Sequence, residues 1–278
     1  MRPLTSPFPY YGGKSKQVKT LLRYLPPHKT YVEVFGGGGS LLLAKEPSPL
    51  EVYNDIHSGV VNFYRVLRDN QDELIAKLRL TPFSREEFYY CRDNWKSCTD
   101  PVEKARMWFT CAIQRFSGSG DGGWRYAIFP GKKSNCVDSW HNNIERVLPV
   151  AARFASVIIE QRDFRKLLET YNHPDICLYL DPPYVPESRI GGSHRYEFEM
   201  SVEHHREMLD MLIQHKGKIL LSSYDNPLYQ VLAEHGWTRI DYGVTASSLP
   251  KTCTGRLRSR METLWLNSYS PPPFSSSV

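Results

Sequence analysis

The run ICLYLDPPYVPES (residues 176–188) places an acid, two prolines and a tyrosine directly after an apolar segment. Residues 176–180 carry no charge and are typical of a buried strand. Pro182 and Pro183 cannot continue it as a central strand, because neither has a backbone N–H. The chain is therefore predicted to leave the sheet at Asp181. In an open α/β sheet, ligands bind beyond the carboxyl ends of the strands.

The DPPY tetrad suits chemistry on an exocyclic amine of a planar base. Such a nitrogen is a poor nucleophile, because its lone pair is delocalised into the ring. The Asp181 carboxylate and the Pro182 carbonyl can accept its two hydrogens, and the rigid prolines Pro182 and Pro183 fix the direction of that carbonyl. Tyr184 offers a ring on which a base can stack. The alternative is a rigid turn headed by an acid, since four-residue motifs also match by chance.

A second signal is the glycine run VFGGGGS (residues 34–40), which lies between a predicted strand and a predicted helix. Glycines let the backbone approach a ligand, and a helix N-terminus favours polar or anionic groups. The dinucleotide fingerprint G-x-G-x-x-G fails, because its third glycine falls on Leu41 or Leu42. Asp55 ends the next strand, where an acid can accept hydrogen bonds from ribose hydroxyls. Together these signals indicate a nucleoside cofactor, with a tight turn and a solvated acid as the alternatives.

The elements that must position these residues alternate between strand and helix. A helix is predicted over Lys14–Leu25, a strand over Thr30–Phe35, a short helix over Leu41–Ala44 and a strand over Leu50–Asp55. Further strands are predicted at residues 156–161, 176–180, 218–223 and 262–267, with a helix over Val202–His215 between them. This order predicts one α/β domain, which opens with a β-turn-α-β unit typical of a nucleotide-binding sheet.

Between the second and third predicted strands the apolar residues change to helical spacing. Val60, Phe63, Tyr64 and Leu67 mark one helix, Asp100 with Pro101 begins another, and a last one is expected before Pro149. We therefore predict a discontinuous catalytic domain (1–56 and 157–268) and a mainly helical insert (57–156). The Ser/Pro-rich tail (269–278) is predicted to be disordered.

The stretch FPYYGGKSK (residues 8–16) resembles a P-loop superficially, but Phe8 stands where the first glycine would be. On this stretch alone, an ordinary surface turn is favoured over a turn that brings Tyr10 and Lys14 to the site. The cysteines show neither a CxxC pair nor zinc spacing. We expect reduced thiols, with Cys111 and Cys177 in the core.

The net charge of +5 permits a polyanionic partner without requiring one. No apolar run approaches the ~20 residues of a membrane span and no signal peptide is evident, so we expect a cytoplasmic protein. Basic residues interleaved with aromatic ones suit nucleic-acid contact, with a solvated face as the alternative. The candidates are Arg115, Phe116, Trp124, Arg125, Lys132, Lys133, Arg256 and Arg258.

From Phe8 to Asn267, these motifs resemble the D12 class of DNA adenine-N6 methyltransferases, the family of the Dam enzymes. The matching segments are Tyr10–Lys14, Phe35–Gly39, Asn54-Asp55, Asp163-Phe164 and Asp181–Tyr184. The resemblance implies a Rossmann-like class I methyltransferase sheet, with the motifs in the α arrangement and the insert as a target-recognition domain. It also implies S-adenosyl-L-methionine as the methyl donor. The implied cofactor contacts are Tyr10, Lys14, Phe35, Gly36, Gly37, Gly38, Asp55, Asp163, Phe164 and Asp181.

The predicted function is therefore to flip an adenine out of double-stranded DNA and to methylate its N6. The catalytic residues would be Asp181, Pro182, Pro183 and Tyr184, in a monomer that needs no metal. The alternatives are a cytosine-N4 or RNA adenine methyltransferase, and a non-catalytic DNA-binding protein. In the family, an aspartate at the head of the tetrad, here Asp181, favours adenine over cytosine. The intact tetrad argues against a non-catalytic protein. The insert stretch RFSGSGDGGWRY departs from the Arg-Tyr-Asn hairpin of Dam-like members, so GATC is not assigned. A role in restriction-modification or a solitary role is left open.

Overall fold

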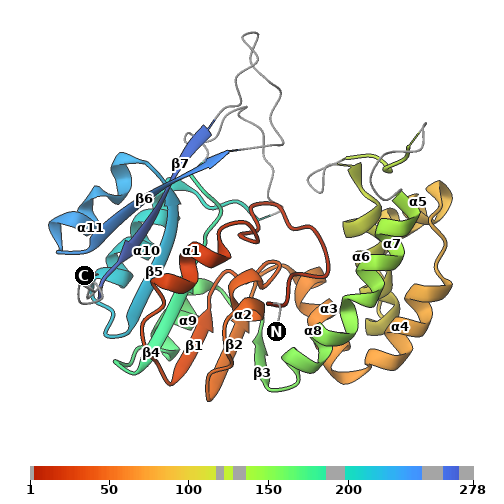
Figure 1. Cartoon of the computed structure of the whole chain (residues 1–278), viewed down its shortest axis with the longest axis horizontal. Helices are drawn as coiled ribbons and strands as arrows, with labels where there is room; N and C mark the ends of the chain where they lie inside the picture. Colours follow the sequence, from red (N-terminus) through yellow and green to blue (C-terminus); the bar gives the residue numbers. More distant parts are fainter. Residues whose placement is uncertain (1–2, 117–121, 128–135, 186–197, 246–258, 269–278) are drawn as a thin grey trace, which may run out of the picture.

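The computed structural model describes residues 3–116, 122–127, 136–185, 198–245 and 259–268. Within them, seven strands form one sheet in the order β3-β2-β1-β4-β5-β7-β6 (Figure 1). The first five in the chain are parallel, whereas β7 runs antiparallel to both β5 and β6. Their bounds are β1 Thr30–Glu33, β2 Leu50–Asn54, β3 Val157–Glu160, β4 Ile176–Leu180, β5 Lys218–Tyr224, β6 Thr238–Thr245 and β7 Ser259–Leu266.

The strand order reverses between β1 and β4, which is the switch point where doubly wound sheets bind ligands. The predicted Rossmann-like α/β fold is confirmed. The strand β6 was not predicted, and β4 ends at Leu180, directly before Asp181, as expected.

Alternate residues of the central strands supply two apolar layers, because side chains on a strand point to opposite faces. Val32, Val52 and Leu178 face one core, which is covered by α9 (Phe164–Thr170), α10 (Val202–Ile213) and α11 (Gln230–Glu234). Their neighbours Tyr31, Tyr53 and Tyr179 face the other core. That face is covered by α1 (Val18–Arg23), α2 (Ser40–Ala44) and α3 (Ser58–Asp69).

The helices between β2 and β3 lie beside the sheet and extend the second apolar core. After α3 come α4 (Gln71–Leu80), α5 (Arg85–Asn94), α6 (Pro101–Gln114), α7 (Cys136–Glu145) and α8 (Val147–Phe154). Figure 1 shows α4–α7 as a group beside the sheet. Phe63, Phe109, Trp140 and Phe154 join these helices to the sheet in one apolar cluster. The division into a catalytic domain and an insert stays a prediction.

Two helix expectations were incomplete and one was wrong. The helix α1 is shorter than predicted and α5 was not predicted. The last helix of the block is in fact two, α7 and α8, and Pro149 lies inside α8 rather than ending a helix. Pro149 is the third residue of α8, where a backbone N–H would have no partner within the helix, so proline is tolerated there. The predicted cap of α6 is confirmed, since Asp100 Oδ1 accepts a hydrogen bond from the Val102 amide at 2.9 Å.

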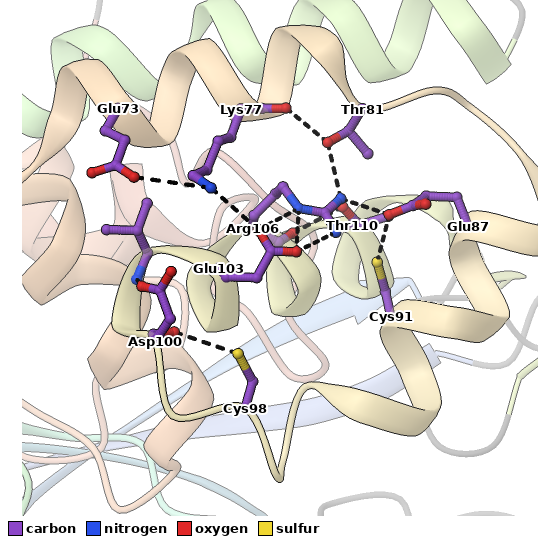
Figure 2. A network of polar contacts seen from close by, with 11 residues as sticks. Glu73, Lys77, Thr81, Glu87, Cys91, Cys98, Asp100, Glu103, Arg106 and Thr110 are labelled. Atoms are coloured by element: carbon purple, nitrogen blue, oxygen red, sulfur yellow. Dashed lines mark hydrogen bonds and ion pairs between the residues drawn. The ribbon is translucent and has the colours of Figure 1, made fainter.

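A buried arginine holds three of these helices together (Figure 2). Arg106 on α6 donates from Nη2 to Glu103 Oε1 at 2.7 Å and from Nη1 to Glu87 Oε1 on α5 at 2.6 Å. It also donates from Nη1 to Thr81 Oγ1, just after α4, at 3.0 Å. One guanidinium therefore satisfies partners from three segments at once.

Replacing Arg106 by leucine is expected to lower the free energy of unfolding by about 1.5–3 kcal/mol, because the half-buried carboxylates of Glu87 and Glu103 lose their charged hydrogen bonds. Glu103 then keeps Lys77 at 3.7 Å. Urea unfolding followed by circular dichroism measures this change. Arg79, whose pair with Glu145 is exposed, is the matched control, and its leucine variant should change stability by less than ~1 kcal/mol. Equal losses for both variants would contradict a special role for Arg106.

Two further expectations concern thiols and membranes. Cys111 and Cys177 are buried as predicted, and burial raises the pKa of the Cys177 thiol to about 12. Across the described residues, every helix is too short or too polar to cross a bilayer.

Candidate active site

A pocket lies beyond the carboxyl ends of β1, β2 and β4. It has a volume of about 710 Å³, part of which is open to solvent. Its lining includes most of the residues predicted to bind the cofactor: Tyr10, Lys14, Phe35, Gly36, Gly37, Gly38, Asp55 and Asp181, together with Pro183. The structure thus brings together residues from the N-terminal segment, the glycine loop, the end of β2 and the DPPY tetrad. Pro182, Tyr184, Asp163 and Phe164 lie outside this lining.

The glycine loop is shaped by aromatic side chains of the protein itself. A Cβ atom on Gly36 would lie 2.2 Å from Tyr53 Cε2, and one on Gly37 would lie 2.7 Å from the Tyr10 ring. Tyr53 and Tyr64 donate hydrogen bonds to the carbonyls of Gly37 (2.7 Å) and Gly38 (3.0 Å). Gly37 also has a φ of 49°, which favours glycine. These positions must be glycine for internal packing, a reason that the sequence interpretation had missed.

Asp55 joins this loop to the start of α3. Its Oδ2 accepts from the Gly37 amide at 2.7 Å, and its Oδ1 accepts from the His57 amide at 2.8 Å. Burial raises the pKa of this carboxyl, and the two amides oppose that effect. An ionised carboxylate has about four acceptor positions, so Asp55 keeps capacity for a ligand.

Asp163 and Phe164 support the site from outside the pocket lining. Asp163 Oδ1 caps α9 by accepting from the Arg165 amide at 3.0 Å, and its Oδ2 lies 2.9 Å from Arg165 Nη1. The Phe164 ring packs against Phe35, with ring centroids 6.0 Å apart. Since Phe35 lines the pocket, Phe164 braces one of its walls.

Lys14, in the segment before α1, contacts the acid and the tyrosine of the DPPY tetrad. Lys14 is buried and its Nζ lies 3.0 Å from Asp181 Oδ1; Lys14 also donates a hydrogen bond to the Tyr184 hydroxyl. The surface-turn interpretation of Gly12–Lys14 is therefore wrong. Tyr184 packs edge-on against Tyr224 at the end of β5, with centroids 4.2 Å apart. Glu262 on β7, which the sequence analysis did not single out, lies 3.5 Å from Lys14 Nζ.

The charges of this cluster are set by burial and by the lysine. Burial raises the pKa of Asp181 to about 6, even though the Lys14 ammonium lowers it. Burial alone would lower the pKa of Lys14, but Asp181 and Glu262 together raise it above its ordinary value. At neutral pH the site therefore contains an ionised Asp181 beside a protonated Lys14.

Glu33 is a second lining carboxyl that sequence analysis missed. Its Oε2 accepts from the Tyr31 hydroxyl and from the Leu42 amide, both at 2.9 Å. Burial raises its pKa to about 8, so it is neutral at pH 7. Sequence analysis could have found Glu33, because it lies at the end of the strand that precedes the glycine loop.

Four of the predicted DNA-contacting residues are among the described ones, and they lie directly after α6 and in residues 122–127. Arg115 and Trp124 form an antiparallel bridge, and the Arg125 amide donates to the Gln114 carbonyl at 2.8 Å. Trp124 packs against Phe83, while Phe116 is 64% exposed. Arg85 of α5, which was not predicted, lies over the Trp124 ring at 5.0 Å. Lys132, Lys133, Arg256 and Arg258 lie outside the described residues.

The fold and the pocket define a Rossmann-like α/β protein whose site lies at the switch point of the sheet, with a glycine loop and an acid after β4. The family model for the D12 class N6 adenine-specific DNA methyltransferases matches residues 10–244. The chain belongs to this family and is an adenine-specific DNA methyltransferase.

Relatives agree with this assignment. The chain is 28% identical over 246 residues to the type II methyltransferase M1.LlaDCHI of Lactococcus lactis subsp. cremoris, a match that covers 81% of this chain and 84% of the relative. It is 22% identical over 247 residues to the DNA adenine methylase of Salmonella typhi, which covers 81% of this chain and 84% of that protein. The DNA N-6-adenine-methyltransferase of Escherichia phage P1 is 23% identical over 84% of this chain and 32% of its own length.

Proposed function

We propose that the enzyme transfers a methyl group from S-adenosyl-L-methionine to N6 of an adenine flipped out of double-stranded DNA. The observation that carries the proposal is the position of Asp181. Its carboxylate lines the same pocket as the glycine loop and Asp55. An acceptor for the amine therefore adjoins a space that suits a nucleoside cofactor.

The residues that line the pocket fit the proposed cofactor in chemistry. Asp55 would accept from the ribose hydroxyls, while Tyr10 and Phe35 supply ring surfaces. When bound, S-adenosyl-L-methionine supplies a methyl group already activated on sulfur, so the protein chiefly has to position and polarise the reactants.

The protein's part in the reaction is to make the adenine amine nucleophilic. Asp181 and the Pro182 carbonyl would accept its hydrogens and stabilise the positive charge that develops on nitrogen as it attacks. The prolines keep the carbonyl in place. Tyr184, which is held between Lys14 and Tyr224, would offer its ring to the base.

The activity is expected to rise with pH through about 6, because Asp181 must be ionised to accept a hydrogen bond from the amine. Below that pH its carboxyl is protonated and the acceptor is lost. The pH profile of kcat/KM for DNA, measured with saturating S-adenosyl-L-methionine, tests this expectation, because it reports groups of the enzyme before DNA binds. An acid limb near pH 4, the ordinary range of an aspartate, would contradict it.

Replacing Asp55 by alanine is expected to weaken S-adenosyl-L-methionine binding by ~1–3 kcal/mol, because the ribose hydroxyls and the Gly37 amide both lose an acceptor. Isothermal titration calorimetry on the protein without DNA gives this number. Asp175, an exposed acid paired with Lys29, is the control. Unchanged affinity in the Asp55 variant would remove it from the cofactor site.

The direct test is to incubate the enzyme with S-adenosyl-L-methionine and a random-sequence duplex library and to identify every modified base. We expect N6-methyladenine in one sequence context. Methylation at cytosine N4, or of RNA adenine in a parallel assay, would favour the alternative substrates.

We also propose that the segment around Arg115 and Arg125 reads the bases next to the target. A pocket that holds one flipped base cannot read its neighbours, so donors outside the sheet must contact them in a groove. In the same library assay, Arg115→Ala or Arg125→Ala should relax the base preference at one position of the recognised sequence. Each arginine contact to a base contributes ~1–3 kcal/mol of discrimination. An unchanged preference in both variants would place the reading element elsewhere.

A further inference from the structure

Beside the pocket, one cation is shared by two carboxylates. Lys14 Nζ lies 3.0 Å from Asp181 Oδ1 and 3.5 Å from Glu262 Oε2. The side chains of Lys14 and Glu262 are only 4% and 7% exposed. Three ionisable groups thus form a compact cluster that water reaches poorly.

This cluster couples Lys14 to the role proposed for Asp181. The ammonium of Lys14 lies on Oδ1 of the carboxylate, so this ion pair lengthens if Asp181 turns towards the amine. Moving Lys14 away would leave a buried ammonium without a partner, which is strongly unfavourable in a protein interior. A second carboxylate within reach removes that cost.

Glu262 is placed to be that second partner. It lies on β7, opposite Tyr224 of β5 and Tyr242 of β6, so neighbouring strands hold its backbone on both sides. The Tyr242 hydroxyl donates to its Oε2 at 3.2 Å. Glu262 is outside the pocket lining, whereas Lys14 and Asp181 are part of it. Glu262 can therefore act on the reaction by holding Lys14 and through the effect of its charge on Asp181.

We propose that Glu262 is a positioning residue for methyl transfer, which holds the Lys14 ammonium when Asp181 turns to the target amine. The proposal rests on the function proposed for Asp181. In this scheme Lys14 shifts from one carboxylate towards the other and remains paired throughout. The number of buried charges does not change as the substrate binds.

The charged groups around Asp181 make the proposal measurable by pH. Facing it are Lys14 from the N-terminal segment, Glu33 from β1, Glu262 from β7, and the tyrosines Tyr179, Tyr184, Tyr229 and Tyr242. Tyr224 faces Lys14. Burial raises the pKa of Glu33 to about 8, so this carboxyl is neutral in the acid range. Among the described groups, Lys14 and Glu262 therefore act most directly on the charge of Asp181 near pH 6. Removing the negative charge of Glu262 should lower the pKa of Asp181.

The experiment compares kcat and the pH profile of kcat/KM for DNA in the wild type, Glu262→Gln and Glu262→Asp. In the glutamine variant, Asp181 is the remaining carboxylate partner of Lys14, so we expect kcat to fall by about 10–100-fold and the acid limb to move to lower pH. KM for S-adenosyl-L-methionine should change little. The aspartate variant keeps the charge but reaches less far, so its acid limb should stay in place and its kcat should be intermediate.

Glu51→Gln is the matched control, because Glu51 is also a buried glutamate paired with a lysine, Lys45, but lies away from the pocket. Its acid limb should not move. A glutamine variant of Glu262 with wild-type kcat, or with a lower kcat and an unmoved acid limb, would overturn the proposal. If that variant does not fold, wild-type kcat in Glu262→Asp would do the same. Absence of methyl transfer by the wild type would instead contradict the proposed function itself.

Discussion

Replacing Asp181 by asparagine is expected to reduce the rate of methyl transfer by about 10²–10³-fold, the usual effect of removing one preorganised group that stabilises developing charge. The amide keeps the shape of the side chain but is a weaker acceptor, and it cannot balance the positive charge on the attacking nitrogen. Single-turnover transfer of labelled methyl groups to duplex DNA measures the chemical step.

The same variant should retain its fold and bind DNA within a few-fold of the wild type, because Asp181 acts on the flipped base and not on the duplex. Asp175→Asn, a change at an exposed ion pair, controls for the loss of a negative charge. A rate near that of the wild type in Asp181→Asn would show that another group accepts from the amine.

Among single glycine-to-alanine changes in the glycine loop, Gly36→Ala is expected to be the most damaging. The new Cβ would lie 2.2 Å from Tyr53 Cε2, and Tyr53 is a fully buried ring whose hydroxyl holds the Gly37 carbonyl. The loop and the ring cannot both keep their positions. We expect a loss of about 1–3 kcal/mol in stability, typical of overpacking, and a loss of affinity for S-adenosyl-L-methionine of at least tenfold.

Thermal unfolding and calorimetry measure these two effects separately. Gly236→Ala is the control, because Gly236 has a φ of 80° but nothing lies within 4 Å of a Cβ there. That variant should lose about 1–2 kcal/mol through backbone strain and bind the cofactor as the wild type does. If Gly36→Ala kept both the stability and the cofactor affinity of the wild type, the packing account of the loop would be wrong.

Local sequence signals located the strands and the ends that matter for chemistry. An uncharged apolar run followed by Asp181 and two prolines marks a buried strand and its end, because proline cannot donate within a sheet. The acid, proline and glutamate at residues 100–103 mark a helix start for an equally local reason, the unpaired amides of the first turn. The strand β6 escaped prediction because Arg239 and Asp241 make its surface pattern polar, as is common at sheet edges.

Some errors arose because a local pattern has more than one solution. Proline often ends a helix, but it also fits the first turn of one. Pro149 lies in the first turn of α8. The glycines of the loop were explained by a ligand, whereas Tyr53 and Tyr10 supply a sufficient reason for Gly36 and Gly37. Which ring meets which glycine depends on the packing of separate segments.

The sequence by itself determined the α/β class, the order of the motifs and the residues after each strand that line the pocket. Only the tertiary structure decided which charges meet. Lys14 near one end of the chain and Glu262 near the other lie 3.5 Å apart, because the N-terminal segment covers the site and β7 inserts between β5 and β6. Residues far apart in sequence are brought together by strand order and sheet pairing, and no local periodicity encodes those contacts.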